Sequence, residues 1–99
     1  MRLLNLFQQV KDENLTKEKL DDLYSQMARL RADVKIELSG ILKEKAIAML
    51  QNPEKSVAER KVTWQGSEKG LREIELKSYI SAIGDHLNSL KTRIYALLT

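Results

Sequence analysis

The feature that most constrains the fold is a heptad pattern in the last third of the chain. Its apolar residues follow one another in steps of four and three: Leu76, Ile80, Ile83, Leu87, Leu90, Ile94 and Leu97. Such steps place every member on one stripe of an α-helix, and a stripe of three heptads is typical of a coiled-coil seam. The pattern predicts a helix over residues 68–98, and we expect its seam to carry oligomerisation.

A second run of apolar residues, between residues 17 and 51, has the same helical spacing. Thr16 precedes this run as an N-cap, and Glu18 lies in the first turn, where the helix dipole favours an acid. The pair Asn52-Pro53 ends the helix, because proline disfavours helical backbone in the residue before it. Gly40 lies inside the run and indicates a bend or a close helix contact.

Two shorter helices are expected before and between the long ones. Residues 2–10 place their large apolar side chains on one helix face. Residues 57–65 follow a capping box, in which Ser56 and Glu59 satisfy each other's backbone amides. Glycines at 66 and 70 then interrupt the helical pattern before the C-terminal helix.

These elements predict an all-α protein with a single domain over residues 1–99. Two long amphipathic helices joined by a short connection usually fold back as an antiparallel pair. One pair buries only its facing stripes, so side chains beside them could pack against a second subunit: Tyr24, Met27, Tyr79 and Tyr95. The expected architecture is an antiparallel long-helix hairpin with short accessory helices, assembling into an oligomeric helical bundle.

Composition excludes several classes of chemistry. The chain of 99 residues has no cysteine, and His86 is its only histidine. A disulfide framework, a thiolate metal site and a zinc site built from several histidines are therefore excluded within one chain. Neither common glycine-rich phosphate-binding motif is present. We expect a protein that is not an enzyme and holds no metal or cofactor.

The same composition bears on location and on partners. No secretory signal and no apolar stretch long enough to span a membrane is seen, so we expect a cytoplasmic protein that does not bind membranes. The chain has 17 basic and 14 acidic residues, a formal charge of +3. This excess is too small for a protein that coats nucleic acid by charge alone.

One cluster nevertheless combines cations with an aromatic ring. Its members are Lys43, Lys45, Arg60, Lys61 and Trp64. Lysine and arginine neutralise phosphates, and an exposed ring stacks on an unpaired base, so the cluster predicts a single-stranded nucleic-acid site. The alternative is that Trp64 is a core ring and that the cations only solvate their helix, as is usual for tryptophan in small domains.

Several segments resemble one known family. They are Met1-Arg2-Leu3, Leu4-Asn5-Leu6, Leu15-Thr16-Lys17-Glu18-Lys19-Leu20, Lys43-Glu44-Lys45-Ala46, Ala58-Glu59-Arg60-Lys61-Val62-Thr63-Trp64-Gln65-Gly66 and Leu90-Lys91-Thr92-Arg93-Ile94-Tyr95-Ala96-Leu97. Together they resemble the UvsY-type phage recombination mediators, loosely but over most of the chain. This chain is shorter than is expected of that family.

The resemblance implies a homo-oligomer that binds single-stranded DNA in the host cytoplasm. It further implies a role in loading a RecA-like recombinase while a single-strand-binding protein is displaced. The alternative is a small helical protein–protein interaction module, an inhibitor, adaptor or assembly subunit, without nucleic-acid binding. Salt-sensitive binding of an oligonucleotide distinguishes the two, because only phosphate contacts release counterions.

Overall fold

The computed structural model describes residues 2–98, with side chains from Leu4 onward. Its elements in chain order are α1 (Arg2–Val10), α2 (Lys17–Leu50), α3 (Val57–Gln65) and α4 (Glu68–Leu98). There is no strand between residues 2 and 98, so the all-α prediction is confirmed. The helix bounds match the expected ranges, except that α2 ends at Leu50, one residue earlier than expected.

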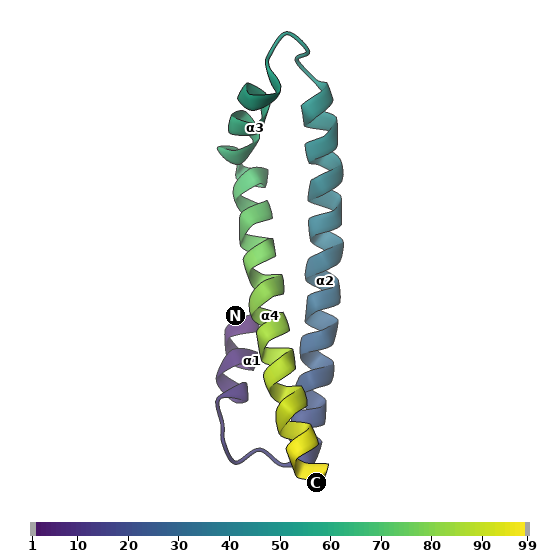
Figure 1. Cartoon of the computed structure of the whole chain (residues 1–99), viewed down its shortest axis with the longest axis vertical. Coiled ribbons are helices and arrows are strands. Elements are labelled where there is room, and N and C mark those ends of the chain that lie inside the picture. Colours follow the sequence, from purple (N-terminus) through teal and green to yellow (C-terminus); the bar gives the residue numbers. More distant parts are fainter. Residues whose placement is uncertain (1, 99) are drawn as a thin grey trace.

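The long helices α2 and α4 form an antiparallel hairpin that runs the length of the molecule (Figure 1). The fold is a narrow rod with extents of 61 × 21 × 17 Å. Charged pairs connect the two helices, among them Arg72 Nε, which lies 2.6 Å from Oε2 of Glu37. The predicted long-helix hairpin is therefore confirmed.

The C-terminal heptad seam faces α2 of the same chain. Its buried members are Leu76, Ile83, Leu87 and Leu90, its half-buried members are Ile80 and Ile94, and Leu97 is exposed. The buried side chains are already covered by their own chain and are not available to a second subunit. Its packing closes the hairpin within the chain, and the assignment of this seam to oligomerisation is not supported.

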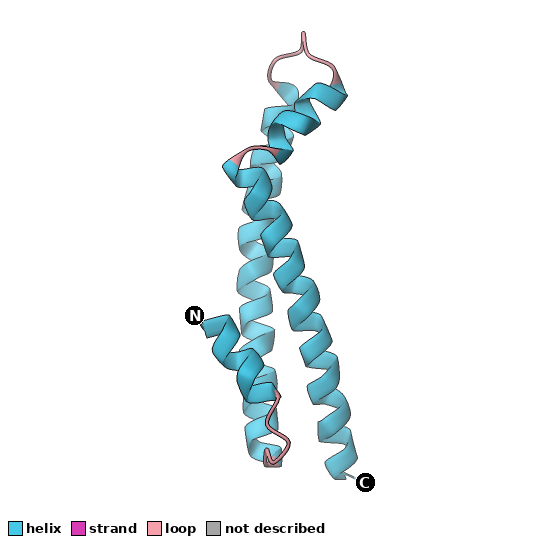
Figure 2. Cartoon of the chain, turned by 90° about the vertical axis from the view of Figure 1, so that its left-hand side faces the viewer, coloured by secondary structure: helices cyan, strands magenta, loops and turns pink. Residues whose placement is uncertain are grey.

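The larger hydrophobic cluster lies in the half of the hairpin that α1 covers. The short helix α1 packs on both α2 and α4 (Figure 2), and it contributes the buried side chains of Leu6 and Val10. Met27 has no exposed surface within this cluster. The expectation that Met27 packs against a second subunit is wrong, because α1 supplies the missing cover.

Two contacts of α4 hold α1 in place. Nη1 of Arg93 donates a hydrogen bond of 2.6 Å to the carbonyl oxygen of Val10, the last residue of α1. The ring centroids of Phe7 and His86 are 4.2 Å apart. The single histidine of the chain therefore packs against an aromatic ring.

The ends of the helices follow the signals in the sequence. The hydroxyl of Thr16 accepts a hydrogen bond from the backbone amide of Lys19, and Ser56 does the same for Glu59, so both predicted N-caps are formed. Beyond the end of α2, Asn52 has a φ of 56°. Asparagine tolerates this left-handed conformation better than most residues, and Pro53 follows it.

A tight turn between α3 and α4 depends on a glycine. The hydroxyl of Ser67 accepts a hydrogen bond of 3.0 Å from the backbone amide of Gly70, in the first turn of α4. A Cβ atom at Gly70 would lie 1.8 Å from the carbonyl oxygen of Trp64. Only glycine permits this close approach of the two helix ends. The turn sets the angle at which α3 meets the hairpin.

The side of α2 opposite its core positions is unusually apolar, and we call it the outer face of α2. Its residues are all exposed: Ser25, Ala28, Arg29, Ala32, Ile36, Ser39, Gly40, Lys43, Ala46, Ile47 and Leu50. A Cβ atom at Gly40 would meet nothing within 4 Å. The expectation of a close helix contact at this glycine is therefore wrong for the single chain.

The contrast between the two glycines gives a test of the turn. We expect Gly70→Ala to lower the free energy of unfolding by more than about 2 kcal/mol, because the turn must open to admit the methyl group. Gly40→Ala is the matched control, and it should raise stability by up to ~1 kcal/mol, because alanine is the better helix former. Urea unfolding followed by circular dichroism measures both. Equal effects of the two substitutions would contradict the close approach.

Candidate nucleic-acid interface

Trp64 lies inside the protein. Helix α3 places it against Ile41 of α2 and Leu76 of α4, and only 8% of its surface is exposed. A ring packed in this way has no free face on which a base could stack. The prediction that Trp64 stacks on nucleic acid is therefore wrong, and the alternative reading of Trp64 as a core ring is confirmed.

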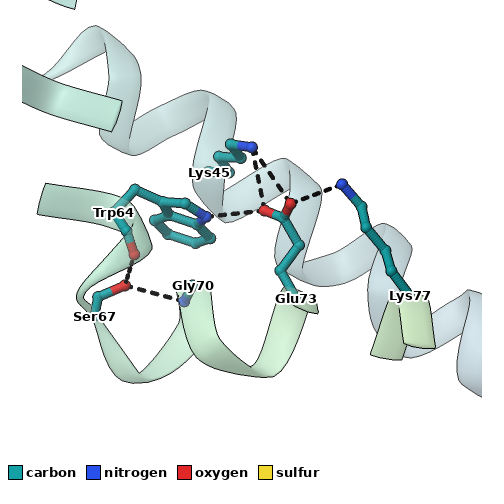
Figure 3. A network of polar contacts seen from close by, with 6 residues as sticks. All are labelled: Lys45, Trp64, Ser67, Gly70, Glu73 and Lys77. Atoms are coloured by element: carbon teal, nitrogen blue, oxygen red, sulfur yellow. Dashed lines mark hydrogen bonds and ion pairs between the residues drawn. The ribbon is translucent and has the colours of Figure 1, made fainter. Parts of the chain in front are cut away.

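The indole of Trp64 is tied to a buried carboxylate. Its Nε1 donates a hydrogen bond of 2.9 Å to Oε1 of Glu73 (Figure 3). Lys45 of α2 lies 3.2 Å from Oε1 of the same carboxylate, and Lys77 lies 2.8 Å from its Oε2. The carboxylate therefore joins α2, α3 and α4 at one point.

The surroundings of Glu73 stabilise its charged form. The pKa of Glu73 is lowered from 4.5 to about 2, mainly by the hydrogen bond from Lys77, against the opposing effect of burial. Hydrogen bonds from Trp64 and Lys45 lower the pKa further. A buried charge is tolerated only where it is paired and its lone pairs are satisfied, and these three donors meet both conditions.

From the sequence alone, Glu73 and Lys77 have the spacing of an ordinary surface ion pair, and the role of Glu73 in joining three helices is missed. The pair is formed as its i,i+4 spacing indicates, but Glu73 is buried. Its other donors come from positions nine and 28 residues away in the chain, so no local pattern could reveal them. The one available signal was position: Glu73 lies three residues before Leu76, on the same stripe of the helix.

Arg60 also has a structural role. Its Nη1 donates to the carbonyl oxygen of Met49 in the last turn of α2. The last carbonyls of a helix have no partner within it and carry the negative end of the helix dipole, so a guanidinium is well suited to this position. Its Nε donates a longer hydrogen bond, of 3.5 Å, to the carbonyl oxygen of Ser56.

The structure therefore divides the five predicted site residues. Trp64, Lys45 and Arg60 hold the end of the hairpin together, whereas Lys43 and Lys61 are exposed on the surface. Arg60 and Trp64 point into the protein from α3, and Lys61 points away from it. Arg60, Lys61 and Trp64 therefore do not form one exposed basic and aromatic face.

A different set of cations surrounds a cavity at this end of the hairpin, which we call the tip cavity. Its volume is about 400 Å³. Its lining residues are Ala48, Gln51, Asn52, Lys55, Arg60, Thr63, Trp64, Ser67, Glu68 and Lys69. Three of these are basic and one is acidic, and the remaining side chains are mostly polar. The first turn of α4 also borders the cavity, and the positive end of a helix dipole favours anions.

Other kinds of site are not seen in the described part of the chain. Among residues 2–98, no group of three or more histidine, aspartate or glutamate side chains could hold a metal ion. In the same range, no helix is both long enough and apolar enough to cross a membrane.

Comparison with known proteins adds no assignment. No protein-family model matches the chain, and no curated protein or solved structure matches it either. The resemblance to UvsY-type mediators thus stays a prediction from the sequence.

The lowered pKa of Glu73 predicts a pH-dependent contribution to stability. The folded pKa is below that of an unfolded glutamate, so this contribution is complete above about pH 4.5 and is lost as the pH falls toward 2. We expect Glu73→Gln to cost about 2 kcal/mol at pH 7, less than the full shift implies because the two lysines are partly solvated. The deficit should shrink as the wild-type carboxylate is protonated.

Urea unfolding at several pH values between 7 and 2 measures this difference. The exposed Glu54→Gln removes the same charge outside the network and serves as the control. If the stability curves of the wild type and Glu73→Gln run parallel down to pH 2, Glu73 is not held as a buried carboxylate.

Proposed function

We propose that this protein binds single-stranded nucleic acid at the tip cavity. The observation that supports the proposal is the convergence of Lys55, Arg60 and Lys69 on one concave surface. Positive side chains and a helix N-terminus that face the same space are suited to a phosphate group. The contacts are then to the backbone of the nucleic acid, and base stacking on Trp64 has no part in them.

The cations of the tip cavity differ in how freely they can reach a ligand. Lys69 lies 2.8 Å from Glu44, but both side chains are about half exposed. Such a surface ion pair contributes little energy, so Lys69 can turn toward a phosphate at low cost. Lys55 is exposed in the loop. Arg60 is held by the end of α2 and adds its charge from a fixed position.

The more specific parts of the proposal rest on the resemblance. A preference for single-stranded DNA, assistance to a RecA-like recombinase and displacement of a single-strand-binding protein are properties that UvsY-type mediators imply. We propose them for this chain as an oligomeric accessory protein of phage-type recombination. Each of these properties requires contact with phosphates, and that requirement is the part which the basic tip cavity supports.

Charge reversal at the tip cavity tests phosphate binding. We expect the double variant Lys55→Glu, Lys69→Glu to bind a fluorescently labelled single-stranded oligonucleotide at least ~10-fold more weakly at low salt, measured by anisotropy. The slope of log K against log salt should fall in magnitude by about 1.4, which corresponds to two phosphate contacts on a single strand.

The double variant Lys17→Glu, Lys19→Glu is the matched control, because it makes the same change in net charge at the opposite end of α2. It should bind much as the wild type does. Equal losses in the two variants would mean that only the net charge matters, and an absence of wild-type binding at low salt would refute the proposal.

A second function is favoured by a different observation, the outer face of α2. This face exposes the large apolar side chains of Ile36, Ile47 and Leu50, and large exposed apolar patches mark sites of protein association. A helical interaction module without nucleic-acid binding is the function that we propose if the tip cavity binds no oligonucleotide.

A further inference from the structure

The outer face of α2 has the pattern of a packing surface without a partner in this chain. Ile36 is 72% exposed, Ile47 57% and Leu50 81%. The face runs from Ser25 to Leu50, about 38 Å at the rise of an α-helix. Arg29 and Lys43 are its only charged residues. A helix side that only contacts water normally carries charges throughout.

The charges around this face are arranged by sign along the helix. Toward the N-terminus of α2 the same side continues with exposed acids, Glu18, Asp21 and Asp22. The basic residue Lys43 lies near the other end. A surface with acids at one end and a base at the other is complementary to a copy of itself in the opposite direction.

We propose that the outer face of α2 binds the outer face of a second copy of this chain, antiparallel and about a two-fold axis at Ala32. Facing residues then have numbers that sum to about 64, because Ala32 faces itself. Ala28 faces Ile36 of the other copy, and Ser25 faces its Ser39. The small side chains allow the two helix backbones to approach closely, and Ile36 fills the space above Ala28.

The same register brings opposite charges together. Asp21 comes opposite Lys43 near the middle of the face, toward each end of the interface, and Arg29 lies close to Asp33 along one edge. The two-fold axis repeats each pair, which gives four ion pairs. Lys35 projects from the opposite edge to Arg29, so the register does not bring these like charges together. The charge pattern therefore favours a second copy over an unrelated partner.

The available area predicts a reversible dimer. In this register the two helices overlap from Lys17 to Ile47, which covers about 45 Å of length and ~10 Å of width. The buried surface is on the order of 500 Å² per copy, or ~1,000 Å² in total, which is the lower limit for a specific interface. We expect dissociation in the micromolar range and weakening by salt. The proposal does not depend on nucleic-acid binding, and it places the two tip cavities at opposite ends of the dimer.

Sedimentation equilibrium of the full chain from about 1 µM to about 1 mM tests the proposal. The wild type should pass from the mass of one chain to that of two and no further. Ala32→Glu places two like charges at the two-fold axis and should weaken association at least ~10-fold, with unchanged helicity because residue 32 is exposed. Ser81→Glu, an equal change at an exposed position of α4, should dimerise as the wild type does.

Charge exchange tests the antiparallel register. Asp21→Lys and Lys43→Asp should each weaken the dimer, and the double variant that combines them should restore it. A wild type that stays monomeric at 1 mM, a mass that grows beyond two chains, or an Ala32→Glu protein that dimerises normally would overturn the proposal. So would a double variant that is no tighter than either single one.

Discussion

The structure depends on one apolar seam that is closed within a single chain. The heptad residues of α4 meet the core positions of α2, and Leu76, Ile83 and Leu90 retain no exposed surface. This packing spans most of the length of both long helices, and it is the main source of buried apolar area. Because a two-helix hairpin is thin, packing α4 on one side of α2 leaves the opposite side of α2 uncovered. At one end of the hairpin, α1 is needed to cover the core.

The other end of the hairpin is held by a polar interaction. There the carboxylate of Glu73 accepts from Trp64, Lys45 and Lys77, and so it joins three helices at one buried point. Removing one partner of such a network leaves an unpaired buried charge, which costs far more than an exposed pair contributes. The network fixes α3 against the hairpin, and the tip cavity lies between them. Structure and proposed function are therefore connected through a residue that touches no ligand.

Much of the fold could be predicted because helical periodicity and capping are local. The spacing of apolar residues and the caps at Thr16 and Ser56 located the helices to within about one residue. A stripe, however, identifies only the face that is buried and not the surface that buries it. The same heptads serve equally well in an intramolecular hairpin and between subunits, so the pattern alone does not distinguish the two arrangements.

The candidate site could be predicted less well, because it is built from contacts that are distant in sequence. Lys45 and Arg60 were recognised as cations near an aromatic ring, but their partners lie on other helices: the carboxylate of Glu73 and the carbonyl of Met49. Whether a cation is free to bind a phosphate depends on such partners. Lys55 and Lys69 carry no sequence motif and became candidates only through their places around the cavity.

The central claim, that the seam closes within one chain, is tested most directly by paramagnetic broadening in mixed samples. The chain has no cysteine, so Lys17→Cys provides a single site for a nitroxide at the start of α2. In chains that carry both the label and ¹⁵N, the amides at the end of α4, such as those of Arg93 and Tyr95, should broaden. When the label is on unenriched chains mixed with ¹⁵N chains, these amides should stay sharp. Equal broadening in both samples would show that α4 packs on α2 of another chain.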